Sequence, residues 1–135
     1  MFPSNYNNFF RNYSSSIAKL LSEVNTDLIN ESVKLIKKNI DSNNTIFIVG
    51  NGGSASIASH VSVDFARVAK VKSLTFNNSN LITCFANDYG YENWVKESIK
   101  SYCSINDLLI LISSSGKSAN IVNAAKYCND HKIDL

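Results

Sequence analysis

The sequence has little net charge and no long hydrophobic run. Its 13 lysines and arginines nearly balance 11 aspartates and glutamates, which leaves a formal net charge of +2 at pH 7. A net charge this small provides no positive electrostatic field that would bind nucleic acid. No apolar stretch approaches the ~20 residues that a membrane-spanning helix needs, and the start lacks the basic and apolar regions of a signal peptide. We therefore expect a cytoplasmic, soluble protein with no nucleic-acid or membrane partner.

Cysteine is scarce as well. The three thiols, Cys84, Cys103 and Cys128, are odd in number and widely scattered. This pattern fits neither a disulfide framework nor the spacing of a metal site, so we expect reduced thiols in the core. A chain of 135 residues, 44% of them hydrophobic, suffices for one modest core.

Two helical patterns precede a region in which strands and helices alternate. Apolar residues spaced three and four apart predict one amphipathic helix through Ile17–Val24 and a second through Ile29–Ile40, with a capping signal at Asn25. Strands are predicted from residue 45, over 73–76 and over 107–112; helices over 54–69, from the caps at 77–80 through 85, over 91–103 and over 119–130; and a loop over 87–90. The alternation predicts a three-layer α/β fold with a parallel sheet between helices. Residues 1–44 would form a helical hairpin and residues 45–135 the α/β domain.

The last residues, 131–135, have the pattern of a loop entering another strand. A sheet of only three strands leaves an edge open. We therefore expect that the chain is truncated at its carboxyl end or that it leans on a partner chain.

The strongest functional signal is the segment Gly50–Ala55 (GNGGSA), which joins an apolar strand to a helix. The free N–H groups and the dipole of a helix N-terminus attract anions, phosphate above all. The spacing also satisfies a dinucleotide-binding turn. That site needs an acidic residue at the end of the next strand, where this sequence has Asn77 and Asn78. The pattern therefore argues against a dinucleotide.

A second polar loop, Ser113–Ser118 (SSSGKS), follows the last predicted strand. It contains the end of a P-loop, but Leu111 occupies the position of the required first glycine. Its hydroxyls, lysine and backbone amides suit an oxyanion; the alternative is a serine-rich turn that caps a helix. Because the carboxyl ends of parallel strands share one edge of the sheet, we expect both loops at one site.

His60 and Asp64 lie four residues apart and hence on one helix face. Such a pair is commonly a surface ion pair. Close behind an anion-binding loop, a histidine can instead transfer protons or bind a metal.

Together with Asn87-Asp88-Tyr89-Gly90-Tyr91, these motifs resemble the sugar isomerase (SIS) family, and most closely its phosphoheptose isomerase branch. The resemblance begins near residue 15 and continues to the end of the chain. It implies an SIS-type sheet, similar to flavodoxin and Rossmann folds, and the isomerisation of sedoheptulose 7-phosphate to a manno-heptose 7-phosphate for surface polysaccharide. That reaction moves a proton between adjacent carbons through an enediol.

The resemblance also implies roles for residues. The phosphate would be held by Ser113, Ser114, Ser115 and Ser118. The sugar would be held by Asn51, Gly52, Gly53, Ser54, Asn87 and Asp88. His60 and Asp64 would be catalytic. The resemblance requires no cofactor, but it allows a zinc ion with His60 and Asp64 as ligands. A homotetramer is implied too, with the N-terminal helices at its interface and the sites shared between subunits.

Two departures from the family pattern keep an alternative open. The family has glutamate where this chain has Asp64, and a misplacement of about 1 Å can cost ~10²-fold in rate. The family's late catalytic residues, a glutamine or glutamate and a histidine, have no counterpart before Leu135. The alternative is a non-catalytic SIS module that binds a phosphosugar or a protein partner, as does a relative that engages the bacterial replication initiator.

Overall fold

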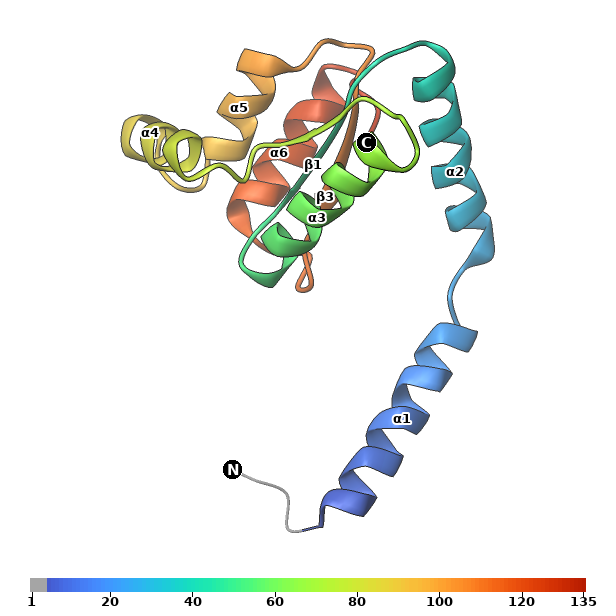
Figure 1. The fold of residues 1–135 in the computed structure, drawn as a ribbon. Helices are drawn as coiled ribbons and strands as arrows, with labels where there is room; N and C mark the ends of the chain where they lie inside the picture. The colour runs from blue at the N-terminus through green and yellow to red at the C-terminus, as the bar shows by residue number, and fades with distance from the viewer. Residues whose placement is uncertain (1–4) are drawn as a thin grey trace. The chain divides into compact units, whose positions relative to one another are not determined.

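A computed structural model describes residues 5–135, and the chain divides into two compact units, one ending at Val33 and the other running Lys34–Leu135. The elements in chain order are α1 (Tyr6–Ser22), α2 (Thr26–Asp41), β1 (Ile46–Gly50), α3 (Gly53–Arg67), β2 (Ser73–Thr75), α4 (Ser79–Tyr89), α5 (Trp94–Tyr102), β3 (Leu108–Ile112) and α6 (Ala119–Asp130). Figure 1 shows this order from blue to red.

The two predicted N-terminal helices are confirmed as α1 and α2. The Asn25 side-chain oxygen accepts the backbone N–H groups of Asp27 (3.0 Å) and Leu28 (3.3 Å), so the predicted cap of α2 is confirmed. Helix α1 ends at Ser22, which leaves Val24 outside the helix whose stripe it was expected to extend. None of the helices described in residues 5–135 is long and apolar enough to cross a membrane.

The sheet has three parallel strands in the order β2-β1-β3. Ile46 of β1 pairs with Ser73 on one side and with Leu108 on the other. β1 is thus the central strand, and all five of its residues are buried. The predicted parallel α/β fold is confirmed.

Alternate side chains of β1 enter two separate core layers, as strand geometry requires. Phe47 and Val49 pack with residues of α5 and α6. Ile46 and Ile48 pack on the other face with Ala58 of α3. Figure 1 shows α3 and α6 on opposite sides of the strands, so the sheet is covered on both faces.

Helix α5 contributes three apolar residues to the core. Trp94, Val95 and Ile99 are fully buried, and all belong to the layer beneath Phe47. This layer holds the largest side chain of the core, so α5 is the element that anchors it.

The loop predicted over residues 87–90 is wrong. Residues 87–89 form the last turn of α4, which ends where Gly90 adopts φ +84° and donates its N–H to the Ala86 carbonyl at 3.0 Å. Asn and Asp favour turns, but glycine is the residue that enters the left-handed region without strain. The helix therefore continues until it reaches Gly90. The predicted cap is confirmed at Asn78, whose side chain accepts the Asn80 N–H.

The segment predicted to be a loop entering another strand, residues 131–135, pairs with β3 through a single bridge. Asp134 forms an isolated parallel bridge with Leu108, and its carbonyl accepts the Leu109 N–H at 3.0 Å. Leu108 and Leu109 are buried, whereas the rest of β3 is half-buried. The bridge places residues 133–135 along the outer edge of β3.

The prediction of three core thiols holds for two of them. Cys128 is buried and Cys103 is half-buried, but Cys84 is exposed on α4. Cys84 lies at the rim of an apolar cavity beside Leu81 and Phe85, so apolar neighbours in the sequence do not bury it.

Candidate functional site

The end of β1 passes so close to α3 that only glycine fits at position 50. A Cβ on Gly50 would lie 2.6 Å from backbone atoms of Ser54. Gly52 then makes the turn with φ +54°, and α3 begins at Gly53. Among the described residues no side chain caps this helix. The Ser54 N–H already donates to the Asn51 carbonyl at 2.9 Å and the Ala55 N–H to the Gly52 carbonyl at 3.0 Å, so the helix dipole rather than a set of free N–H groups is what its first turn offers a ligand.

Asn77 clamps this loop from the end of β2. The Gly50 N–H donates to the Asn77 side-chain oxygen at 3.1 Å, and the Asn77 Nδ2 donates to the Gly50 carbonyl at 2.8 Å. A carboxylate at this position would accept the first bond but could not donate the second. The residue that stands where a dinucleotide site needs an acid therefore has a different task, which is to hold the glycine loop.

Asn51 and Asn120 form a closed pair of side-chain amides. Asn51 Nδ2 donates to Asn120 Oδ1 at 2.9 Å, and Asn120 Nδ2 donates to Asn51 Oδ1 at 2.8 Å. The Tyr91 hydroxyl also donates to Asn51 Oδ1 at 3.3 Å. Asn120, in the first turn of α6, is only 2% exposed. The network ties the glycine loop to α6 and to the connection between α4 and α5.

A cavity of about 390 Å³ opens at this network. Its lining residues are Asn51, Tyr91, Glu92, Ser118, Ala119 and Asn120. Asn51 comes from the loop after β1 and Ser118 from the loop after β3. The two polar loops of the sequence thus meet at one cavity, at the carboxyl ends of neighbouring strands.

The serine loop offers hydroxyl and N–H donors. Ser113 Oγ donates to Ser118 Oγ at 3.5 Å, and Ser115 Oγ accepts the Lys117 N–H at 3.2 Å. Gly116 turns the loop with φ +64°. Ser114 and Ser115 are exposed. No side chain among the described residues caps α6, so its dipole and first N–H groups are free to face an anion.

His60 and Asp64 pair with one another, but the structure does not bring them into the cavity. His60 Nε2 lies 3.3 Å from Asp64 Oδ2, and the histidine side chain is 80% exposed. Within residues 5–135 no three His, Cys, Asp or Glu side chains gather as a metal site. Zinc takes three or four protein ligands, so these two residues do not fit a zinc site by themselves.

Asn87 and Asp88 also lie outside the cavity lining. Asn87 Nδ2 donates to Asp88 Oδ1 at 2.9 Å, and the Cys84 thiol points to Asp88 Oδ2 at 3.9 Å. Both residues are exposed on the last turn of α4. Tyr91, the last residue of the same motif, is the one that lines the cavity.

Sequence reasoning missed Asn77, Tyr91, Glu92 and Asn120 as site residues. Tyr91 ends the motif Asn87–Tyr91, but the family resemblance implies no role for it. Asn77 and Asn120 each carried a readable signal, because each is an amide directly after a predicted strand or its loop, at the edge of the sheet where ligands bind.

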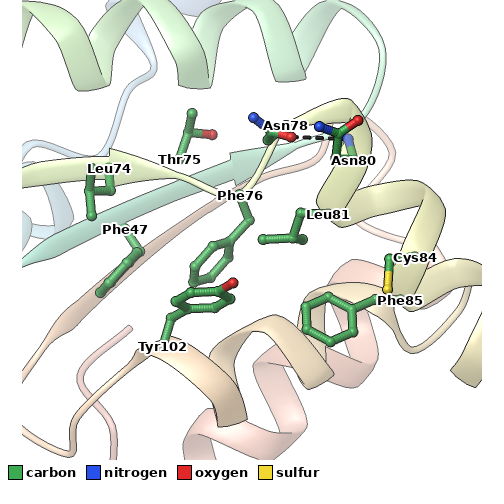
Figure 2. A pocket seen from close by; sticks show the side chains of 10 residues that line it. All are labelled: Phe47, Leu74, Thr75, Phe76, Asn78, Asn80, Leu81, Cys84, Phe85 and Tyr102. Atoms are coloured by element: carbon green, nitrogen blue, oxygen red, sulfur yellow. Dashed lines mark hydrogen bonds between the residues drawn. The ribbon is translucent and has the colours of Figure 1, made fainter.

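A second cavity, of about 450 Å³, lies beside β2 and is chemically different. Figure 2 shows Phe47, Phe76 and Tyr102 in a row, with Leu81 and Phe85 beside them. The Phe47 and Phe76 rings stack with centroids 4.9 Å apart. No charged side chain belongs to the residues that line this cavity. It suits apolar groups and cannot be the phosphate site.

A parallel sheet with two polar loops converging at its strand ends defines an α/β domain with a candidate site for a small polar ligand there. The sequence model described as SIS domain matches residues 9–135. The chain therefore belongs to the SIS domain family.

Relatives in this family are phosphoheptose isomerases. The chain is 33% identical over 128 residues to the phosphoheptose isomerase of Aliarcobacter butzleri, covering 90% of this chain and 67% of the relative. It is 34% identical over 106 residues to that of Thermodesulfovibrio yellowstonii, covering 74% and 53%. It is 33% identical over 112 residues to phosphoheptose isomerase 2 of Campylobacter jejuni, covering 77% and 54%. The chain thus spans about half to two thirds of the length of these relatives.

Solved structures of phosphoheptose isomerases share the fold. The enzyme from Neisseria gonorrhoeae superposes with a TM-score of 0.82 at 22% identity, covering 93% of this chain and 70% of that one. The enzyme from Francisella tularensis gives 0.81 at 20% identity with the same coverage. At this identity the likeness establishes the SIS-type architecture, which confirms the fold expected from the motifs.

Proposed function

We propose that this protein is a cytoplasmic phosphosugar isomerase that converts sedoheptulose 7-phosphate to a manno-heptose 7-phosphate for surface polysaccharide. The observation that carries the proposal is the convergence of Asn51 and Ser118 on one cavity. Relatives support the proposal, because the chain shares about a third of its aligned residues with phosphoheptose isomerases. A phosphosugar needs an anion site and a polar sugar site side by side, and the two loops supply one each.

The serine loop is the proposed phosphate site. Ser113, Ser114, Ser115 and Ser118 bring hydroxyl donors, and the uncapped N-terminus of α6 adds N–H groups and a favourable dipole. The glycine loop, from Asn51 to Ser54, is the proposed sugar site. Asn87 and Asp88 lie outside the cavity lining of this chain, so their proposed contact with the sugar requires the shared site described below.

His60 is the proposed proton-transfer group, with Asp64 orienting it. Because Asp64 is 3.3 Å from Nε2, the carboxylate holds the N–H there and leaves the Nδ1 lone pair free to accept a proton. In the reaction a base takes a proton from C1 of the ketose while an acid protonates O2, which gives the enediol. Return of a proton to C2 and loss of the O1 proton complete the aldose.

The exposure of His60 is explained if a second copy of the chain completes the site. Large apolar side chains are exposed along α1, namely Phe9, Phe10, Tyr13, Ile17, Leu20 and Leu21. An exposed apolar stripe of this kind is typical of an oligomer interface. We propose a homotetramer in which sites are shared. A zinc ion, where present, would take His60 and Asp64 as two of its ligands.

Incubation of the protein with sedoheptulose 7-phosphate tests this function, with aldose formation followed by NMR. We expect turnover by the wild type and a loss of about 10²–10⁴-fold in His60→Ala, the usual contribution of a general acid or base. His131→Ala is the matched control, because His131 is also exposed and its ring interacts with Tyr127 at the far end of α6, outside the cavity lining. Substrate binding by the wild type without turnover would instead favour a non-catalytic SIS module.

A further inference from the structure

We propose that Asn120 and Tyr91 lock the Asn51 amide as a hydrogen-bond donor to the reacting sugar, which makes Asn120 a positioning residue for the isomerisation. The inference rests on the proposed function and states that Asn51 donates to the sugar rather than accepts from it. The sequence motifs mark Asn51 as a site residue but give no role to Asn120 or Tyr91.

The count of donors and acceptors at Asn51 carries the argument. Its Oδ1 has two acceptor positions, and both are used: one by Asn120 Nδ2 at 2.8 Å and one by the Tyr91 hydroxyl at 3.3 Å. Its Nδ2 has two hydrogens, and one is given to Asn120 Oδ1 at 2.9 Å. What Asn51 retains for a ligand is therefore one N–H, beside the 390 Å³ cavity that it lines.

The network also resists a turn of the amide. Turning Asn51 alone would set N–H against N–H and oxygen against oxygen across the pair, and Asn120 is too buried for water to compensate. Turning both amides would preserve the pair, but the Tyr91 hydroxyl would then have to accept from Asn51 Nδ2 instead of donating to Oδ1, and a phenol oxygen is a better donor than acceptor. The arrangement in which Asn51 Oδ1 accepts from both partners, and Nδ2 keeps a free N–H, is therefore the favoured one.

A fixed donor suits the chemistry of an enediol. The oxygens on C1 and C2 gain negative charge as the proton leaves carbon, so a bond from an N–H strengthens in the transition state. A contact that strengthens there raises kcat with little effect on KM. Preorganisation by Asn120 makes the donor available without reorientation during the reaction.

The kinetic test compares variants at the network with a matched asparagine elsewhere on α6. Asn120→Asp keeps the size but cannot donate to Asn51, and we expect kcat to fall about 10- to 100-fold, at the lower end of what loss of an oxyanion donor costs, with KM within about threefold. Tyr91→Phe should lower kcat less, about threefold to tenfold, because one acceptor position remains bound. Asn129→Ala changes an exposed asparagine at the other end of the same helix, outside the cavity lining, and should change kcat by less than about twofold.

A second readout, independent of turnover, is the side-chain amide signal of Asn51 in an ¹⁵N NMR spectrum, assigned by its loss in Asn51→Asp. We expect slow solvent exchange of one amide proton in the wild type and at least about tenfold faster exchange in Asn120→Ala. An unchanged Asn51 signal in that variant overturns the inference, as does a rise in KM at constant kcat in Asn120→Asp. A wild type that leaves sedoheptulose 7-phosphate unchanged refutes the proposed function, whereas the NMR experiment still decides the donor lock.

Discussion

Single residues at the end of β1 set the geometry of the site. Gly50 fits because it has no Cβ, and Asn77 holds it through both of its backbone groups. Gly53, three residues on, faces open space, since nothing lies within 4 Å of where its Cβ would be. A side chain is therefore excluded by steric overlap at position 50 but not at position 53.

Gly50→Ala tests the steric role. The new methyl group would press against the Ser54 backbone, which cannot move without shifting α3. We expect the free energy of unfolding to fall by about 1–3 kcal/mol, as overpacking usually costs. Gly53→Ala is the control and should be neutral or stabilising by up to about 1 kcal/mol, because alanine suits a helix better than glycine. Equal losses from the two variants in urea unfolding would contradict this account.

At the scale of elements, α4, α5 and α6 place the three thiols in different surroundings. Cys84 is exposed on α4, whereas Cys103 follows α5 and Cys128 lies within α6 against the core. Burial raises the pKa of Cys103 to about 12, with a further contribution from the nearby Asp107 carboxylate. Burial also raises the pKa of Cys128 to about 11. Both thiols stay protonated in the folded chain at pH 9.

Thiol labelling with iodoacetamide checks this difference. At pH 8–9 the folded protein should take up one label, at Cys84, and Cys84→Ser should take up none. In guanidinium all three thiols should react, because the unfolded chain ionises them near the ordinary value of 9.0. Labelling of Cys128 in the folded state would refute the packing of α6.

The same shifts give stability a pH dependence. From pH 9 up to about 11 for Cys128, and up to about 12 for Cys103, the unfolded state loses thiol protons that the folded state keeps. The unfolded state binds fewer protons in that window, so the free energy of unfolding falls as pH rises. Below pH 9 these two thiols contribute no slope.

At the scale of the whole molecule, the chain has one unit with a layered core and one that ends at Val33 and presents apolar side chains to solvent. Helix α1 buries none of its residues. An amphipathic helix with an exposed apolar side is costly in water unless another surface covers it. The proposed homotetramer supplies such a surface.

Sedimentation at micromolar concentration tests the oligomer. We expect a species larger than a monomer for the wild type and a monomer for the double variant Leu20→Lys, Leu21→Lys, since both leucines are about two-thirds exposed (67% and 69%). The double variant Ser14→Lys, Ser15→Lys adds the same charge to the same helix at polar positions and should still associate. A wild type that sediments as a monomer would refute the assembly.

Much of the fold could be predicted because its signals are local. The continuous apolar run of β1, the stripe that buries Trp94 and Ile99, and the Asn25 cap all depend on neighbours within a few residues. The end of α4 was misjudged although it too is local. The turn-forming Asn87 and Asp88 outweighed Gly90 in the sequence, whereas in the chain the glycine ends the helix.

The site was only half predictable. Both polar loops were found, because a glycine-rich or serine-rich turn between strand and helix is visible in one segment. Their partners were not, because Asn120 lies 69 residues from Asn51 and Asn77 lies 27 residues from Gly50. The prediction that His60 and Asp64 act in catalysis stays a prediction, since both lie outside the cavity of this chain.

The order of strands and helices, the parallel sheet and the two polar loops can be predicted from the sequence, because hydrophobic periodicity and turn chemistry act over short stretches. Which amides meet depends on the tertiary structure. The order β2-β1-β3 puts β1 between its two partners, so the ends of all three strands and the first turn of α6 converge on Asn51 and Gly50. Hydrogen bonds between distant side chains follow from that arrangement, and no local pattern encodes them.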